Sequence, residues 1–311
     1  MSNAPLVSIL INNYNYGCYL KQAIDSALAQ TYGHIEIIVV DDGSQDNSVE
    51  VINSYPQPAI TTVFKPNGGQ ASAFNAGLAV AAGDLICFLD ADDYFYADKV
   101  QRIVELFQQH PHLGWIFHKL NYVDTQGNLL EIADPSKDIT QSEVVDFRQV
   151  LATGRRFTQT IPCGLCFRHD LLGQILPMPE ARGVTISDNY IKYAALSLAP
   201  GLFLPHRLAA QRIHDSNTYT FRTDNQVLRA EINIKTGFYL QQNFPGLRRF
   251  ADKLFARGCG EMFAQGASST LRDLPEFRLY LQRYSSPAMV LKTIPKTVFH
   301  ALRFKAKGLG F

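Results

Sequence analysis

Residues 85–93 read Leu-Ile-Cys-Phe-Leu-Asp-Ala-Asp-Asp, a short apolar run that ends in three carboxylates. A run that is so short and so uniformly apolar is typical of a buried parallel strand. We therefore expect Asp90, Asp92 and Asp93 at the carboxyl end of this strand, where open α/β sheets form their ligand crevices. Carboxylates that converge there repel each other unless a cation lies between them, and oxygen ligands suit Mg²⁺ or Mn²⁺. The stretch predicts an α/β sheet with a metal site at its edge.

The chain on either side of this stretch alternates apolar runs with helical patterns. Before residue 113, strands are expected at 6–11, 35–40 and 60–64, and helices at 19–30, 46–54, 71–82 and 98–109. Alternation with short links predicts a mainly parallel central sheet flanked by helices. The less regular region that follows is expected to form strands at 114–117, 165–167, 202–204 and 208–213 and a helix at about 188–198. From residue 226 the pattern is helical, which predicts a C-terminal helical extension.

The composition limits the class of protein. Of the 311 residues 46% are hydrophobic, which is ordinary for a globular enzyme, and no apolar run reaches the 18 residues of a transmembrane helix. No Lys or Arg precedes the first apolar stretch, so a signal peptide is not expected. The five cysteines are odd in number and scattered, and the single C-x-x-C pair, Cys163 and Cys166, is too little for a zinc site. We therefore expect buried thiols and a cytoplasmic protein.

Charge is distributed unevenly along the chain. From position 277 onward there are seven Lys or Arg and no Asp or Glu, so the preceding residues carry 22 basic and 28 acidic side chains. An acidic body is a poor partner for nucleic acid, because affinity for nucleic acid comes from neutralising phosphates. The basic tail, with a helix expected to start at Pro295, has two interpretations. It either packs on the body with a solvated basic face or makes a peripheral contact with the anionic inner face of a membrane.

Two further polar segments leave predicted strands at the same edge of the sheet. Asp42 follows the second strand, and its carboxylate can accept a hydrogen bond from an imide N–H such as that of uracil. An ordinary Asp-Gly turn is the alternative. After the first strand, Asn12 offers a polar contact to a base, and Tyr14 offers a face for base stacking. The alternative for Tyr14 is a side chain that packs under its own loop.

Two glycines precede the Ala-rich helix, in the segment Pro66-Asn67-Gly68-Gly69-Gln70. A glycine such as Gly69 at a helix start lets backbone N–H groups approach an anion. The segment is neither G-x-G-x-x-G nor a P-loop, so a plain helix-entry loop is the alternative.

Taken in order, residues 5 to about 115 resemble family 2 of the inverting glycosyltransferases, which have the GT-A fold. The resemblance rests on the stretches VSILINNYN, VVDDGS and NGGQASAFNAGLAVAAGDLICFLDADD. It implies that Asp42 binds the base of a nucleotide-sugar donor. In the D-x-D element, it implies that Asp90, next to Ala91, binds the ribose and that Asp92 binds Mn²⁺ or Mg²⁺. The ion holds the donor diphosphate, and a Lewis acid there stabilises the leaving group.

An inverting enzyme also needs a general base on the far side of the anomeric carbon, to take the acceptor's proton. The resemblance implies that this base is Asp188, in the segment Ile186-Ser187-Asp188-Asn189-Tyr190. The family's usual Glu is replaced by Ser187, so a supporting contact is absent. The alternative for Asp188 is a helix N-cap, and the two roles are compatible.

The segment Gln211-Arg212-Ile213-His214-Asp215-Ser216 is similar to the family's late R-x-H element. The resemblance implies that His214 completes the metal shell and that Arg212 steadies phosphate. A neutral imidazole is a reasonable ligand for Mn²⁺, although a lone His at a strand end also has a structural interpretation. Phe74 stands where many relatives carry Arg, so any phosphate contact by that Arg is missing.

Together these patterns predict an inverting, metal-dependent glycosyltransferase that moves a sugar from a UDP-sugar to a hydroxyl of a glycan or lipid-linked acceptor, in surface polysaccharide or glycoconjugate synthesis. Residues 1–225 would form the GT-A domain, with a nucleotide-binding half at 1–112 and an acceptor half at 113–225, followed by the helical extension at 226–311. A non-catalytic nucleotide-sugar-binding module of the same fold is the alternative. A phosphotransferase of the haloacid-dehalogenase type is disfavoured, because its nucleophilic Asp follows the first strand and not the fourth.

Overall fold

The structure is a computed structural model that describes residues 4–56, 58–132, 136–154, 164–180, 186, 188–215, 217 and 226–283. The chain divides into two compact units. The first comprises residues 1–147, 158–184 and 198–215, and the second comprises 148–157, 185–197 and 216–311. The predictions for Cys163, Ser187 and the basic tail from residue 284 onward lie outside the described residues.

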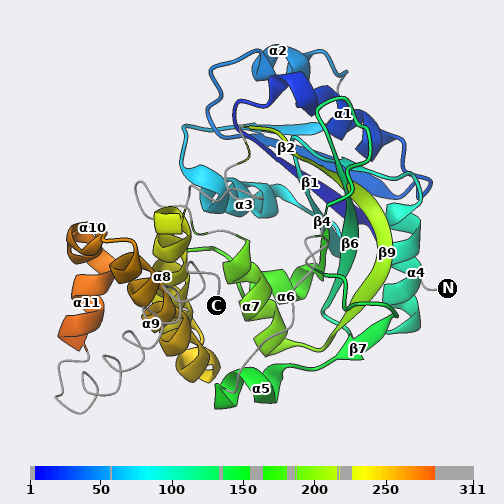
Figure 1. The fold of residues 1–311 in the computed structure, drawn as a ribbon. Coiled ribbons are helices and arrows are strands. Elements are labelled where there is room, and N and C mark those ends of the chain that lie inside the picture. The colour runs from blue at the N-terminus through cyan, green and yellow to red at the C-terminus, as the bar shows by residue number, and fades with distance from the viewer. Residues whose placement is uncertain are drawn as a thin grey trace. The chain divides into compact units, whose positions relative to one another are not determined.

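The first unit is built on one sheet (Figure 1). Its strands within the described residues are β1 (Val7–Asn13), β2 (Ile35–Asp41), β3 (Thr61–Phe64), β4 (Leu85–Asp90), β5 (Tyr94–Phe95), β6 (Trp115–Val123), β7 (Glu143–Val145), β8 (Gly164–Arg168) and β9 (Gly201–Arg212). Their order across the sheet is β3-β2-β1-β4-β8-β6-β9-β5, and β7 pairs with β9. The predicted α/β fold with a central sheet flanked by helices is confirmed.

Strand direction differs between the two halves of the sheet. The neighbours from β3 to β4 are all parallel, as strand-helix alternation predicts. In the other half β8 runs antiparallel to both β4 and β6, while β6 and β9 are parallel. The irregular region after residue 113 carried no alternation from which these directions could be predicted.

Strand β9 is a single element where the sequence predicts two strands separated by Pro205. His118 of β6 pairs with Leu204. The next residue of β6 pairs with Arg207, so two residues of β9 bulge out, and one of them is Pro205. Because proline has no N–H to donate to a neighbouring strand, the break in the apolar pattern marks a bulge rather than a strand end.

Helices cover both faces of the parallel half of the sheet. Those of the first unit are α1 (Gly17–Leu28), α2 (Ser48–Asn53), α3 (Gly69–Val80), α4 (Lys99–Gln109) and α6 (His169–Gly173). On one face, side chains of α1 and α4 such as Leu20 and Ile103 share a buried core with Ile9 of β1. On the other face α3 lies close to Leu10. A Cβ added at Gly77 would come within 2.5 Å of that leucine, so this close packing depends on the glycine.

The second unit is helical in its described residues. It contains α5 (Arg148–Thr153), most of α7 (Asn189–Leu198), α8 (Gln226–Asn243), α9 (Arg248–Ala264), α10 (Ser268–Asp273) and α11 (Pro275–Arg283), with a short 3-10 turn at Pro245–Leu247. Its core is formed mainly by α8 and α9, through residues such as Ile234, Phe238, Phe255 and Met262. The predicted C-terminal helices are present, and the predicted boundary at residue 225 stays a prediction. Within the described residues we find no helix with the length and apolarity that a membrane crossing requires.

The close packing of α8 against α9 gives a stability prediction. A Cβ at Gly258 would lie 2.5 Å from the Ala230 carbonyl oxygen and 2.9 Å from the Ile234 nitrogen. Helix propensity alone favours Ala over Gly by about 1 kcal/mol. We expect the clash to reverse this preference, so that Gly258→Ala lowers the free energy of unfolding in urea by about 1–3 kcal/mol. Gly246→Ala is the control, because a Cβ there meets no atom within 4 Å. Equal unfolding free energies for the two variants would contradict the packing.

Candidate active site

The carboxyl ends of the three central parallel strands bring the predicted polar residues to one edge. Asn12 of β1 lies opposite Val40 of β2 on one side and opposite Asp90 of β4 on the other. The next residue, Asn13, lies opposite Asp41. Ligand crevices of open α/β sheets form at such an edge.

Three carboxylates gather where β4 ends. One oxygen each of Asp90, Asp92 and Asp93 lies within 4.8 Å of the others. Burial, and then the neighbouring Asp92 and Asp90, raise the pKa of Asp93 well above its usual range. Crowded carboxylates of this kind fit a hard divalent cation, which would offset their mutual repulsion. Ala91, between the first two, is fully buried and donates its N–H to the Asn12 carbonyl oxygen at 3.2 Å.

The two predicted metal ligands lie in contact, although 122 residues separate them. His214 Nε2 is 3.0 Å from Asp92 Oδ2, and the two side chains are only 5% and 10% exposed. The Tyr19 ring stacks on the imidazole, with ring centroids 5.1 Å apart. Tyr16 contacts the same imidazole edge-on at 5.5 Å. Neither tyrosine was predicted as a site residue from the sequence. Their positions after β1 do not indicate that they contact His214, which follows β9.

Asn12 links the first strand to the acidic cluster. Its Nδ2 donates to Asp90 Oδ1 at 3.0 Å. Its Oδ1 is buried and has no hydrogen-bond partner among the residues that the structure describes. A buried acceptor without a donor is costly, so the position fits a ligand that brings a hydroxyl or N–H group.

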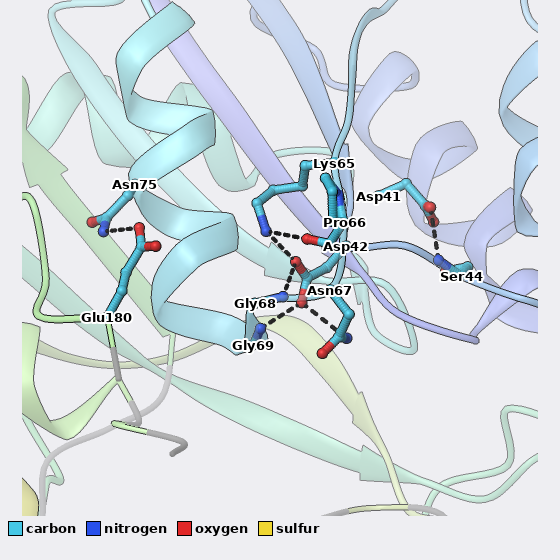
Figure 2. Close-up of polar contacts among 10 residues, drawn as sticks. All are labelled: Asp41, Asp42, Ser44, Lys65, Pro66, Asn67, Gly68, Gly69, Asn75 and Glu180. Atoms are coloured by element: carbon cyan, nitrogen blue, oxygen red, sulfur yellow. Dashed lines mark hydrogen bonds and ion pairs between the residues drawn. The ribbon is translucent and has the colours of Figure 1, made fainter. Parts of the chain in front are cut away.

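Asp42 is held by the loop that precedes α3 (Figure 2). Its Oδ1 accepts from Lys65 Nζ at 2.5 Å and from the Gly68 N–H at 2.9 Å. Its Oδ2 accepts from the Gly69 N–H at 2.7 Å and from Asn67 Nδ2 at 3.2 Å. The anion at these glycines is therefore a carboxylate of the chain itself. Lys65 was missed from the sequence, since only the folded loop brings it to Asp42.

The turn after Asp42 depends on its glycine. Gly43 has φ +78°, and a Cβ there would lie 2.7 Å from the Asn67 nitrogen. Both observations require glycine at this position.

Tyr14, the predicted stacking residue, is 45% exposed, so its ring is accessible. Phe74, the departure noted in the sequence, is a core residue that packs against Phe88 with ring centroids 4.6 Å apart.

Asn75, in the middle of α3, forms hydrogen bonds with a distant segment of the chain (Figure 2). Asn75 Nδ2 donates to the Met178 carbonyl oxygen at 2.9 Å and to Glu180 Oε1 at 2.8 Å, while its Oδ1 accepts from the Met178 N–H at 2.7 Å. One helix thus fixes both the loop around Asp42 and a segment from the later half of the unit.

The Arg212 side chain contacts several segments of the first unit. Its side chain is buried, and the residue is 2% exposed. The guanidinium donates to protein atoms, namely the carbonyl oxygens of Asp92, Asp124 and Thr125 and the side-chain oxygen of Gln22. The phosphate contact that the resemblance implies for Arg212 stays a prediction.

Asp188 belongs to the second unit and lies directly before α7. Its Oδ2 forms an ion pair with Lys192 Nζ at 2.6 Å, and the Asp188 side chain is 27% exposed while that of Lys192 is 5% exposed. The position before the helix agrees with the N-cap alternative, and the exposure leaves the carboxylate accessible. Lys192 was missed, although its i,i+4 spacing was a usable signal.

The sequence matches a known family over just over half of its length. Residues 8–174 match the glycosyl transferase family 2. An uncharacterized glycosyltransferase of Nostoc sp. is 37% identical over 216 residues, which are 68% of this chain and 66% of that relative. The match therefore spans slightly less than two thirds of the relative's own length.

Two solved structures share the fold. Staphylococcus aureus TarS 1–349, in complex with UDP-GlcNAc, has a TM-score of 0.65 at 16% identity, over 98% of this chain and 92% of that one. The Pyrobaculum calidifontis mannosyltransferase PcManGT, in complex with GDP-Man and Mn²⁺, has a TM-score of 0.53 at 16% identity, over 97% and 88%. These likenesses agree with the GT-A fold predicted from the motifs. The family match over residues 8–174, which is more than half of the chain, shows that this chain belongs to glycosyl transferase family 2.

Proposed function

We propose that the protein is an inverting, metal-dependent glycosyltransferase that uses a nucleotide-diphosphate sugar. The observation that carries the proposal is the contact between Asp92 and His214, at the strand end where three carboxylates gather. A paired carboxylate and imidazole beside further carboxylates form a ligand set that suits Mn²⁺, and Mg²⁺ is the other candidate. The complexes named for the two solved structures, one with UDP-GlcNAc and one with GDP-Man and Mn²⁺, support a donor of this class.

The mechanism assigns each side chain a task. Asp92 and His214 would hold the ion, Asp90 would bind the ribose, and Asp42 with Asn12 and Tyr14 would bind the base. When bound, the divalent ion would stabilise the negative charge that develops on the diphosphate leaving group. We propose that Asp188 accepts the proton of the acceptor hydroxyl as that oxygen attacks the anomeric carbon.

Base binding at Asp42 requires an exchange of hydrogen bonds. The carboxylate already accepts from four donors of its own chain. A uracil N3–H must replace one of them, and the two side-chain donors, from Lys65 and Asn67, can move more easily than the backbone N–H groups. We propose a UDP-sugar as the donor on this basis.

Replacing Asp42 by Asn is expected to weaken UDP binding by about tenfold or more, because hydrogen bonds to a charged acceptor contribute about 1.5–3 kcal/mol each. Calorimetric titration with UDP measures the change. Asp46→Asn is the control, since Asp46 binds the Gly17 and Ser48 N–H groups nearby and has no predicted contact with the base. Equal UDP affinities for wild type and Asp42→Asn would refute the assignment of Asp42 to the base.

We propose a glycan or lipid-linked acceptor, in surface polysaccharide or glycoconjugate synthesis at the cytoplasmic side of a membrane. The seven Lys and Arg from position 277 onward, with no Asp or Glu, support a peripheral contact with anionic lipid. No partner role for nucleic acid is proposed, because the preceding residues are net acidic.

A panel of UDP-, GDP- and dTDP-sugars tests the proposed function. Thermal stabilisation is measured with Mn²⁺ and with EDTA, and release of the nucleotide is measured in parallel. We expect a UDP-sugar to stabilise the protein only with Mn²⁺ and to be hydrolysed slowly. Stabilisation by a donor without any hydrolysis or transfer would favour the non-catalytic binding module. Stabilisation by none of the donors would contradict both functions.

A further inference from the structure

Arg212 is the last residue of β9, and its side chain connects three parts of the first unit. Nε donates to the Asp92 carbonyl oxygen at 3.1 Å. Nη1 donates to the carbonyl oxygens of Asp124 at 3.1 Å and Thr125 at 2.9 Å, in the turn after β6. Nη2 donates to Gln22 Oε1 of α1 at 2.5 Å. The fork-shaped guanidinium is suited to such divergent contacts, which a single ammonium cannot reproduce.

The same residue also holds the neighbouring acid. The Arg212 backbone N–H donates to Asp93 Oδ1 at 2.8 Å. Arg212 therefore contacts two consecutive residues of the acidic turn. Its side chain donates to the Asp92 carbonyl oxygen, and its backbone N–H donates to the Asp93 carboxylate. The turn that carries the carboxylates is thus tied to the end of β9.

An aromatic ring extends this connection to the imidazole. The Tyr19 ring lies 4.7 Å from the Arg212 guanidinium carbon and stacks on His214 at 5.1 Å. Cation–π contact and ring stacking both hold the tyrosine in place. His214 in turn lies 3.0 Å from Asp92. Arg212 thus contacts Asp92 directly, and it also contacts Tyr19, which stacks on the His214 ring beside Asp92.

We infer that Arg212 is a positioning residue for the metal ligands and that it does not bind the donor. It fixes the Asp92 turn and the His214 ring relative to each other. Metal affinity depends on such support, since residues that orient the ligands typically change it by about 10–100-fold when replaced. The inference rests on the proposed metal-dependent function.

The test uses Arg212→Lys and Arg212→Met with Mn²⁺ alone as the probe. Free Mn²⁺ is followed by its EPR signal in the absence of donor, and UDP affinity is then measured at saturating Mn²⁺. We expect the Kd for Mn²⁺ to rise about 10–100-fold in Arg212→Met and less in Arg212→Lys, which keeps the charge. UDP affinity at saturating Mn²⁺ should stay unchanged, and kcat should recover as Mn²⁺ is raised.

Arg168 provides a matched control in the same unit. Its guanidinium also donates to carbonyl oxygens, those of Leu113 at 2.8 Å and Phe107 at 3.2 Å, and lies 5.1 Å from the Phe107 ring. It pairs with Leu85 at the opposite end of β4 from the carboxylates. Arg168→Lys and Arg168→Met should lower the melting temperature and leave the Mn²⁺ affinity as in wild type.

Three results would overturn the inference. An Arg212→Met variant that binds Mn²⁺ as wild type does but loses UDP affinity at saturating Mn²⁺ would assign Arg212 to the phosphate. An equal loss of Mn²⁺ affinity in the Arg168 variants would show that the loss in the Arg212 variants comes from lower overall stability and not from the position of the metal ligands. In both cases the wild type still binds Mn²⁺, so the proposed function survives. A wild type that binds no Mn²⁺ would overturn the proposed metal dependence together with the inference.

Discussion

Asp188→Asn is expected to abolish sugar transfer and to leave donor binding nearly intact. The amide cannot accept the proton of the acceptor hydroxyl, and general-base catalysis typically contributes about 10²–10⁴-fold to the rate. We therefore expect kcat to fall by about that factor, while the Kd of UDP in the presence of Mn²⁺ changes by less than about twofold. Nucleotide release with acceptor measures the first quantity, and calorimetric titration measures the second.

The second unit contains a matched control for this variant. Glu231 forms an i,i+4 ion pair with Lys235 at 2.6 Å, with side-chain exposures of 21% and 3%, close to those of Asp188 and Lys192. Glu231→Gln removes a comparable ion pair. It should lower the free energy of unfolding by about as much as Asp188→Asn does, and it should leave kcat unchanged. Near-normal turnover in Asp188→Asn, or an equal loss of turnover in Glu231→Gln, would show that Asp188 is not the base.

Asp92→Asn is expected to remove most of the Mn²⁺ affinity and, with it, the activity. The substitution replaces a charged ligand by a neutral one and leaves His214 beside an amide instead of a carboxylate. Because the cation would stabilise the diphosphate leaving group in the proposed mechanism, we expect kcat/KM to fall by about 10²–10³-fold, similar to the loss of one strong stabiliser of developing charge. Mn²⁺ binding is measured without donor, and initial rates are measured over a range of Mn²⁺ concentrations.

Asp84→Asn is the control for Asp92→Asn. Asp84 lies just before β4, at the opposite end from the acidic cluster, and accepts a hydrogen bond from the Leu6 N–H at 2.9 Å. Its loss should leave both Mn²⁺ affinity and rate as in wild type. An Asp92→Asn enzyme with wild-type Mn²⁺ dependence would place the ion elsewhere.

The sequence was sufficient to predict the parallel half of the sheet and the residues at its edge. Uniformly apolar runs that stop at Asp90 and before Asp42 locate strand ends, and parallel strands expose those ends at one edge. The prediction that Asp92 and His214 lie together came from the family resemblance. No local sequence pattern connects residues so far apart in the chain.

What the sequence did not reveal depends on contacts between distant segments. The four donors to Asp42 come from a loop more than 20 residues away, and each belongs to a residue type that is common in loops. The family resemblance implied a phosphate contact for Arg212, whereas in the folded chain the residue is buried and its guanidinium donates to carbonyl oxygens. Exposure decides between these roles, and exposure is a property of the folded chain.

In the proposed mechanism, carboxylates at the end of β4 would hold a divalent ion that binds the donor diphosphate. Calorimetric titration of UDP into the 311-residue protein, once with Mn²⁺ and once with EDTA, tests this proposal. We expect UDP to bind at least about tenfold more tightly with Mn²⁺, a difference of about 1.4 kcal/mol or more. Equal UDP affinity in Mn²⁺ and in EDTA would contradict the claim.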